Sequence, residues 1–325
     1  MEHHIIPQFY LRGFRDPSID MRRGPRVWTA DLRRKTVSLR SPKTLAKLTD
    51  YYAVEGASGT SHVVETDILT KVEDVAAKVI SRLRDGGPRP IDSQRLDLAV
   101  FIALLSTRTP GWRWPMEQFA AKTMEAVMQE SARHPSYFAD LLRRTNSERT
   151  FSDEEIERMR AETLDPGNFE YRANPVISLD LMIKTARPFA AVIFNMNWCY
   201  MIAPVGNRFI TNDHPVFWYD PTRWPPAANG LASPGCILTF PLRPEIAISA
   251  IWGQQGDVLQ HVDAAMVDFV NQRITRTADR SIFAARKDDA DAALALRAQM
   301  EARNESVGPR QPDIRILGSS GERLD

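Results

Sequence analysis

One stretch of the sequence, residues 62–83 (HVVETDILTKVEDVAAKVISRL), constrains the fold more than any other. At about 100° per residue, its apolar side chains fall on one broad stripe. The stripe comprises Val64, Ile68, Leu69, Val72, Val75, Ala76, Val79, Ile80 and Leu83, and the opposite side carries Asp67, Lys71, Asp74 and Lys78. This pattern predicts an amphipathic helix that packs on a core. Glu65 is the exception, because it projects near the middle of the apolar stripe.

A second charged residue, Arg108, lies in the same way on the apolar side of a helix predicted from Asp92 or Ser93 to about Thr109. A buried charge costs several kcal/mol unless it is paired, neutralised or bound to a metal. Glu65 and Arg108 therefore have two interpretations. They form a buried ion pair between packed helices, or Glu65 is a metal ligand or general base and Arg108 binds a phosphate or carboxylate.

Composition excludes several classes of protein. The chain has 325 residues with 42 basic and 41 acidic side chains, so a net charge of +1 provides no global attraction for nucleic acid or an anionic membrane. Its two cysteines, Cys199 and Cys236, have neither disulfide-scaffold nor metal-site spacing, which favours a reducing cytoplasm. No signal peptide is recognised, and the longest apolar stretch is interrupted by Asn195, Asn197 and Pro204. We therefore expect a soluble cytoplasmic protein without a membrane partner.

The order of the predicted elements favours an α+β fold, because a run of helices precedes a run of short strands. A hairpin is predicted at Arg26–Leu32 and Lys35–Arg40, and Ser152 with Glu155 has the spacing of a helix capping box. The later strands predict a mostly antiparallel sheet, closed by C-terminal helices. We expect one domain over residues 1–305, with a helical insertion at about 92–175 and a flexible tail at 306–325. Two domains divided near Pro175 are the alternative.

His4 has three interpretations. It belongs to an inert exposed terminus, or it is the general base of an HNH nuclease, or it packs in the core against Glu65, Asp213 or a metal. The HNH motif needs a strand before the histidine and a helix with Asn or His soon after it, and both are missing from the pattern.

Asp213 lies where a predicted buried strand meets a tight polar turn, Asn212-Asp213-His214-Pro215. Catalytic carboxylates are often held at such places, because the sheet fixes them beside an opening. The alternative is a turn residue that bonds its own backbone. His214 as a zinc ligand lacks the support of an HExxH or HxH spacing.

Other motifs are incomplete or missing. A PD-(D/E)xK nuclease would need a lysine after Glu245-Ile246, where the chain has Ala247. No P-loop, G-x-G-x-x-G or G-x-S-x-G string is present, so no nucleotide cofactor is expected. Trp112 and Trp114 have two interpretations, as a surface that stacks on bases or sugars and as plugs of the core.

Several separate strings of residues are familiar when they are taken together. They are H-x-I-P-Q-F-Y-L-R-x-F at residues 4–14, Tyr51-Tyr52, Glu65 and Glu73, Arg108-Thr109-Pro110, F-I-T-N-D-x-P-V at residues 209–216, and Phe240-Pro241-Leu242 with Arg243-Pro244. Over roughly residues 4–285 the chain resembles a large bacterial family, designated domain of unknown function 4238. The resemblance implies a bacterial origin and a soluble fold, and it includes His4, Glu65, Arg108 and Asp213. The turn in that family usually reads T-S-D-N-P, so Asn212 and His214 depart from it.

We therefore expect His4, Glu65, Arg108 and Asp213 to converge in a cleft between the helices and the sheet. The chemistry that fits best is metal-assisted hydrolysis of a phosphoester, with a nucleic acid or another phosphoester as the partner. His4, Glu65 and Asp213 would hold a divalent metal ion that activates water, and Arg108 would stabilise the developing anion. Glu65, Arg108 and Asp213 are thus the expected catalytic residues. The distribution of the similar family suggests a nuclease of bacterial defence.

The alternative belongs to a different class, a non-enzymatic binding protein. In that case the same four residues form a buried polar network that fixes the N-terminal segment against the helices. The sequence contains no feature that determines the oligomeric state.

Overall fold

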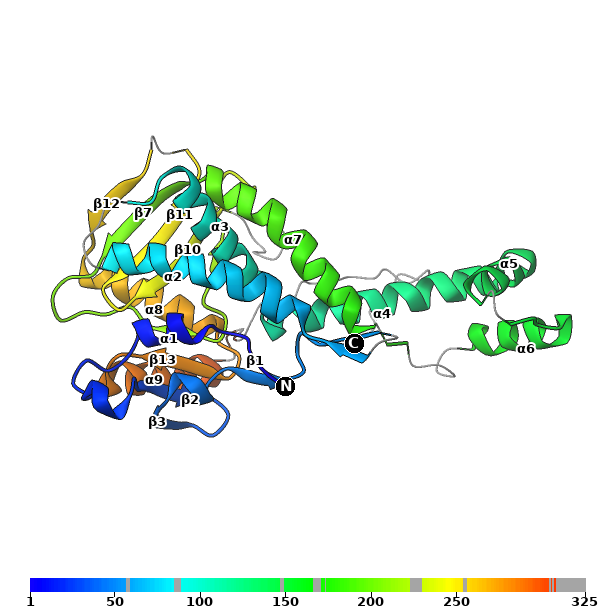
Figure 1. Cartoon of the computed structure of the whole chain (residues 1–325), viewed down its shortest axis with the longest axis horizontal. Helices are drawn as coiled ribbons and strands as arrows, with labels where there is room; N and C mark the ends of the chain where they lie inside the picture. Colours follow the sequence, from blue (N-terminus) through cyan, green and yellow to red (C-terminus); the bar gives the residue numbers. More distant parts are fainter. Residues whose placement is uncertain are drawn as a thin grey trace. The chain divides into compact units, whose positions relative to one another are not determined.

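The helices and strands form an α+β fold (Figure 1). The computed structural model describes residues 1–56, 59–84, 89–146, 149–165, 171–172, 174–222, 230–253, 256–303, 305 and 307. Within these ranges, the side chains of residues 55, 56, 59, 60, 65 and 84 are not described. The predicted tail at 306–325 lies outside the described residues, apart from residue 307.

The described residues fall into two compact units. Unit 1 holds Met1–Arg113 and residues 179–307, and unit 2 holds Trp114–Ser178. The helix predicted from Asp92 belongs to unit 1, and the remaining residues of the expected insertion belong almost entirely to unit 2.

A five-stranded sheet forms the centre of unit 1, with the strand order β12-β7-β11-β10-β9. Its strands are β7 (Asn197–Ile202), β9 (Phe217–Tyr219), β10 (Ile237–Arg243), β11 (Ile246–Ile251) and β12 (Val258–His261). The neighbouring pairs are antiparallel except β12 and β7, which are parallel. The prediction of a mostly antiparallel sheet is confirmed.

Successive side chains of a strand point to opposite faces, and this sheet uses both faces. On β7, Trp198 and Tyr200 join one core, whereas Cys199 and Met201 join another. The first core lies against helices α2 (Thr70–Arg84), α3 (Asp92–Thr107) and α7 (Pro175–Asn195). The second lies against helix α8 (Ala264–Thr277) and a second sheet. Because both faces are covered, β7 is an almost continuous apolar run.

The second sheet has four strands in the order β3-β2-β13-β8. The predicted hairpin supplies β2 (Val27–Asp31) and β3 (Thr36–Arg40), which pair in antiparallel register. Strands β13 (Ser281–Ala284) and β8 (Thr211–Asn212) complete the sheet, and helix α9 (Lys287–Ala302) packs against it. The hairpin therefore supplies half of a sheet whose other two strands come from much later in the sequence.

The central helix begins differently from the prediction. Val64–Leu69 forms a π-helix, η3, and the regular α-helix α2 begins only at Thr70. A π-helix bonds residue i to i+5, so the 100° period does not apply to its residues. The buried side includes Leu69, Ala76 and Val79, but Val75, which the period places on the apolar stripe, is 38% exposed.

Unit 2 is helical within its described part. Its helices are α4 (Pro110–Ala132), which begins in unit 1, α5 (Pro135–Thr145) and α6 (Asp153–Leu164). Phe138, Leu142 and Ile156 form a small core between α5 and α6. The predicted capping box is confirmed, since Ser152 and Glu155 exchange hydrogen bonds of 3.0 and 3.2 Å between side chain and backbone. The helix predicted from Asp92 or Ser93 to about Thr109 is α3, which ends at Thr107.

The N-terminal segment crosses unit 1 and contacts both the helices and the sheet. Strand β1 (Glu2–His4) pairs with β4 (Lys47–Thr49), and α1 (Gln8–Gly13) follows. The Tyr10 hydroxyl, which is buried, donates to the Pro241 carbonyl at 2.6 Å and accepts from the Thr211 hydroxyl at 2.8 Å. The Tyr10 ring stacks on Phe240. Two short strands, β5 (Val54–Gly56) and β6 (Gly59–Ser61), lead to η3.

Pro241 shows why α1 can occupy this position. Proline lacks the N–H of a sheet ladder and is tolerated where a neighbouring strand is missing. Strand β9 pairs only with Ile237–Thr239, so β10 has no partner strand on that side at Pro241. A register shift follows between Pro241 and Arg243. This irregular end of β10 receives the hydroxyl of Tyr10 instead of a strand.

None of the helices in the described ranges combines the length and apolar character that crossing a membrane requires.

Replacing Tyr10 with Phe tests the connection between the N-terminal segment and the sheet. The substitution removes two buried hydrogen bonds and leaves the Pro241 carbonyl without its hydroxyl donor, so we expect the free energy of unfolding to fall by about 1–3 kcal/mol. Urea denaturation followed by circular dichroism measures it. Tyr137→Phe, at a 56% exposed tyrosine, is the control and is expected to change stability by less than about 0.5 kcal/mol. Equal stability of both variants would contradict the role of Tyr10.

Candidate functional site

His4 is engaged through both ring nitrogens. Nδ1 lies 3.2 Å from the Leu45 carbonyl oxygen, and Nε2 lies 2.9 Å from Nε2 of Gln8. Because a carbonyl oxygen only accepts, Nδ1 carries the proton and Nε2 accepts from the Gln8 amide. Burial, with a further contribution from Lys47, lowers the pKa of His4, which favours this neutral form. To bind a metal through Nε2, His4 would have to give up Gln8.

Arg108 is almost fully buried at the C-terminal end of α3, with 1% of its side chain exposed. One terminal nitrogen donates to Oε1 of Glu73 at 2.7 Å, and Nε donates to the Ile5 carbonyl at 2.9 Å. Arg108 therefore forms a buried ion pair with Glu73, and the predicted pair with Glu65 stays a prediction. Glu65 belongs to η3, and its side chain lies outside the described part of the chain.

Asp213 is buried and binds the backbone of the segment that precedes β13. Its Oδ1 accepts from the N–H of Asp279 at 2.9 Å, and Oδ2 accepts from Arg280 and Ser281 at 2.7 and 2.9 Å. Burial raises the pKa of Asp213 to about 6, and these three N–H donors oppose that rise. The carboxyl group thus acts as a clamp on residues 279–281, which are distant from the turn in sequence.

His214 connects the turn to the end of α3. Its Nδ1 lies 3.0 Å from the hydroxyl of Thr109, the residue next to Arg108. Its backbone N–H donates to Oδ1 of Asn212 at 2.7 Å, so the turn bonds its own backbone as well. Burial lowers the pKa of His214 to about 4.

Three of the predicted site residues, His4, Arg108 and Asp213, lie on segments that meet, although their side chains do not share one cavity. A pocket of about 420 Å³ is lined by Asp213 and His214, by Ile5 next to His4, and by Pro110 shortly after Arg108. The side chains of His4 and Arg108 bond to Leu45, Gln8, Ile5 and Glu73 instead. No group of three or more His, Cys, Asp or Glu within the described ranges is arranged to hold a metal ion. The predicted set of His4, Glu65 and Asp213 includes one side chain outside those ranges.

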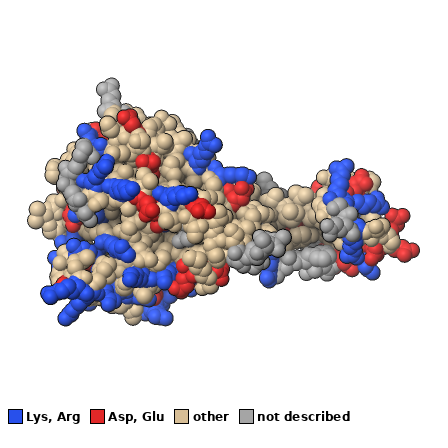
Figure 2. Space-filling model, in the orientation of Figure 1, with Lys and Arg blue, Asp and Glu red and all other residues tan. Residues whose placement is uncertain are grey.

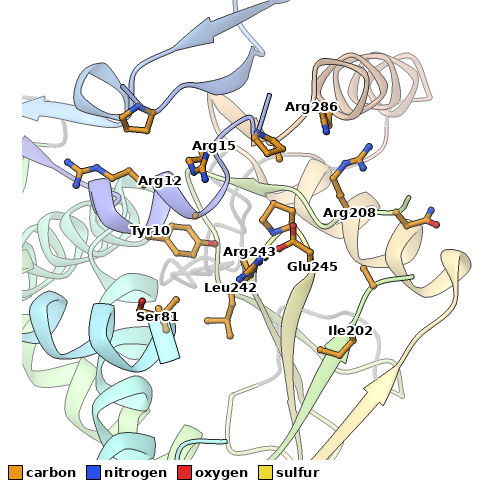
Figure 3. Close-up of a pocket in the computed structure, with 18 of the residues that line it drawn as sticks. Tyr10, Arg12, Arg15, Ser81, Ile202, Arg208, Leu242, Arg243, Glu245 and Arg286 are labelled. Atoms are coloured by element: carbon orange, nitrogen blue, oxygen red, sulfur yellow. Dashed lines mark hydrogen bonds and ion pairs between the residues drawn. The ribbon is translucent and has the colours of Figure 1, made fainter. Parts of the chain in front are cut away.

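A larger pocket of about 920 Å³ is lined in part by α1 (Figure 3). Five arginines line it, and they come from four places in the sequence: Arg12 and Arg15 at the end of α1, Arg208 before β8, Arg243 at the end of β10, and Arg286 before α9. We call this cavity the arginine pocket. Apolar side chains of α1, α2 and β10 form the rest of its wall, among them Phe9, Ile80 and Leu242.

The five guanidinium groups are not equally neutralised. Arg208 binds Asp289 at 2.8 Å, Arg243 binds Glu245 at 2.6 Å, and Arg286 lies 3.7 Å from Asp16.

Arg12 bonds only the neutral amide oxygen of Gln8, at 3.2 Å. Arg15 is half-buried, and neither it nor Arg12 has a carboxylate partner in the part of the chain that the structure describes. The pocket therefore presents unneutralised positive charge beside an apolar wall.

The sequence analysis did not identify this pocket. Its arginines are spread from residue 12 to residue 286, and none of them breaks a helix or strand pattern as a buried charge does. Only Arg12 and Arg243 belong to the strings that carry the family resemblance. The excess of arginine near the N-terminus was the available signal.

The fold and these two pockets define an α+β protein whose N-terminal segment separates a polar turn from an arginine-rich cavity. The chain belongs to the family described as protein of unknown function DUF4238, whose profile matches residues 2–288. The family predicted from the sequence strings is thus confirmed. Comparison with curated proteins and with solved structures gave no match.

Asp213 and His214 are expected to have opposite effects on the pH dependence of stability. The pKa of Asp213 rises on folding from 3.8 to about 6, so the folded chain binds more protons and its stability falls as pH rises through this window. The pKa of His214 falls from 6.5 to about 4, so its contribution to stability rises with pH over a similar window. In wild type the two contributions largely oppose each other.

Single variants separate them. In Asp213→Asn, the free energy of unfolding should rise more steeply between about pH 4 and pH 6.5 than in wild type. In His214→Asn, it should rise less steeply. Urea denaturation at several pH values measures both slopes. Identical slopes in the three proteins would contradict these pKa shifts.

Proposed function

We propose that the protein binds a phosphate-bearing anion in the arginine pocket. The observation that carries this proposal is the pair Arg12 and Arg15, which line the cavity without a carboxylate partner in the described part of the chain. The planar guanidinium group offers paired donors that match a phosphate, and the half-buried Arg15 gains more from such a partner than the exposed Arg12. Arg208, Arg243 and Arg286 surround the same space and add to its positive potential.

The size and the walls of the pocket indicate the kind of anion. A volume of about 920 Å³ is at the upper end of the range of small-molecule sites. Phe9, Ile80 and Leu242 provide apolar surface opposite the charged groups, so the ligand has an apolar or aromatic part as well as its phosphate. Nucleoside phosphates have this combination.

The bonding of the predicted site residues supports a binding protein over an enzyme. Asp213 accepts three backbone hydrogen bonds, Arg108 is bound to Glu73 and Ile5, and His4 is bound to Leu45 and Gln8. This is the arrangement expected of a polar network that fixes the N-terminal segment. In this proposal these residues position α1, and α1 presents Arg12 and Arg15.

Replacing Arg12 and Arg15 together with Ala is the test of the proposal. We expect wild type to bind adenosine diphosphate and pyrophosphate in isothermal titration calorimetry, and the variant to lose at least about tenfold in affinity. Each lost charge-assisted hydrogen bond contributes about 1.5–3 kcal/mol, and about 1.4 kcal/mol is a factor of ten.

The matched control replaces Arg144 and Arg158 with Ala, since both are exposed arginines of unit 2. It removes the same charge and should leave both affinities unchanged. Equal binding by the two double variants, or no binding of either ligand by wild type, would refute the proposal. Thermal unfolding of each variant shows whether it is folded.

The metal-assisted phosphoester hydrolase predicted from the sequence is the second candidate. The observation that favours it is the 420 Å³ pocket, because Asp213 lines it and Lys47, His214 and Arg280 share its wall. In this proposal His4, Glu65 and Asp213 would hold a divalent metal ion, which would supply an activated water, and Arg108 would stabilise the anion.

Metal content distinguishes the two candidates. The hydrolase predicts about one divalent metal ion per chain in the purified untagged protein, lost in Glu65→Gln and retained in Asp67→Asn, an exposed carboxylate of the same segment. The binding proposal predicts no metal that depends on Glu65. Elemental analysis by mass spectrometry measures this, and a metal-loaded wild type would favour the hydrolase.

A further inference from the structure

Positive charge is concentrated in one short part of the chain. Residues 12–43 contain ten Lys or Arg and three Asp or Glu, a formal charge of +7, whereas the whole chain has +1. The remaining residues therefore carry −6 in total. We call residues 12–43 the basic lobe. A protein that is nearly neutral as a whole thus has a strongly polarised charge distribution, which attracts a polyanion to one surface.

The basic lobe begins at the arginine pocket. Arg12, Arg15, Met21 and Pro25 all line that cavity, and the exposed pair Arg22-Arg23 lies between the last two in sequence. Arg22 is paired with Asp20 at 2.9 Å. Arg23 has no carboxylate partner within the described ranges.

The basic lobe extends well beyond the pocket. Strand β2 runs from Val27 to Asp31, about 16 Å at 3.3 Å per residue, and the turn after it carries Arg33, Arg34 and Lys35. At one end β2 pairs with Ala284, near Arg286 of the pocket, and at the other with Ser281. The turn therefore lies at the end of β2 that is farther from the pocket.

The side chains of this turn are exposed and only weakly neutralised. Arg33, Arg34 and Lys35 are all exposed, and the one carboxylate beside them, Asp31, lies 4.0 Å from Arg34. Figure 2 shows Lys and Arg gathered over the lower left part of the molecule, where Figure 1 places β2 and β3. A mononucleotide in the pocket cannot reach this turn, whereas a chain of phosphates can.

We infer that the ligand is a single-stranded nucleic acid, whose terminal nucleotide occupies the arginine pocket and whose following phosphates lie along the basic lobe to Arg33, Arg34 and Lys35. This inference rests on the proposed function. The pocket selects a single strand, because an unpaired nucleotide can enter a cavity of about 920 Å³ and stack on its apolar wall. The basic lobe supplies the sequence-independent attraction to the phosphates.

The test compares two ligands and three variants with wild type. The ligands are a fluorescently labelled single-stranded oligonucleotide of about 20 bases with a 5′ phosphate, and adenosine diphosphate. The turn variant carries Arg33→Ala, Arg34→Ala and Lys35→Ala, and its control carries Lys122→Ala, Arg144→Ala and Arg158→Ala, which are exposed positions in unit 2. The double variant Arg12→Ala, Arg15→Ala is measured beside them.

We expect wild type to bind the oligonucleotide more tightly than adenosine diphosphate. The turn variant should lose about tenfold in oligonucleotide affinity and reduce the slope of log affinity against log salt by about 2, because up to three phosphate contacts are lost at about 0.7 each. Its affinity for adenosine diphosphate should equal that of wild type. The triple control should match wild type with both ligands.

Three outcomes would overturn the inference. If the oligonucleotide binds no more tightly than adenosine diphosphate, and only the Arg12 and Arg15 variant is impaired, the ligand is small and the proposed function stands without the nucleic acid. In a second outcome, the turn variant loses affinity for the oligonucleotide but the Arg12 and Arg15 variant binds both ligands as wild type does. The proposed function then fails, and so does the placement of the terminal nucleotide in the arginine pocket. If vesicles of anionic phospholipid are bound and the oligonucleotide is not, the basic lobe faces a membrane.

Discussion

The structure of unit 1 depends on the burial of polar groups from the N-terminal segment. A buried hydroxyl or guanidinium group costs several kcal/mol unless its hydrogen bonds are satisfied. Tyr10 satisfies this condition through Thr211 and Pro241, and Arg108 is bound to Glu73 and Ile5. These partners are 35 to 231 residues apart in sequence. Burial of the N-terminal segment therefore requires the helices and both sheets to be packed around it as they are in the folded chain.

The residue strings that identify the family meet at this network. Tyr10 belongs to the N-terminal string, Thr211 to the polar turn and Pro241 to the end of β10, and Thr109 bonds His214 across the same region. A shared set of residues at one place in a fold suggests a site, but these side chains are directed at one another. The open, charged surface lies next to the network, in the arginine pocket, where the rigid placement of α1 determines the positions of Arg12 and Arg15.

Local patterns were predicted well because their causes are local. The hairpin at β2 and β3 depends on alternation and a short turn, and the capping box of Ser152 and Glu155 on a spacing of three residues. The ion pair between Arg108 and Glu73 was not predicted, and the predicted pair with Glu65 involves a side chain outside the described residues. A regular helical period was assumed across residues 64–69, whereas these residues form a π-helix, and Glu73, two α-helical turns further on, contacts Arg108. The sequence contains no signal that marks this change of period.

The sequence alone determined the α+β class and the family. It also showed that a few charged residues lie on faces that must be buried. Periodicity, turn chemistry and the cost of desolvation are properties of short segments, so they can be evaluated without coordinates. Only the tertiary structure decides what those charges bind and where positive charge is left without a partner. Arg12, Arg15, Arg208, Arg243 and Arg286 form one pocket because α1, β10 and the start of α9 meet there. Electrostatic interactions depend on distance in space, and that distance is set by the packing of the whole chain.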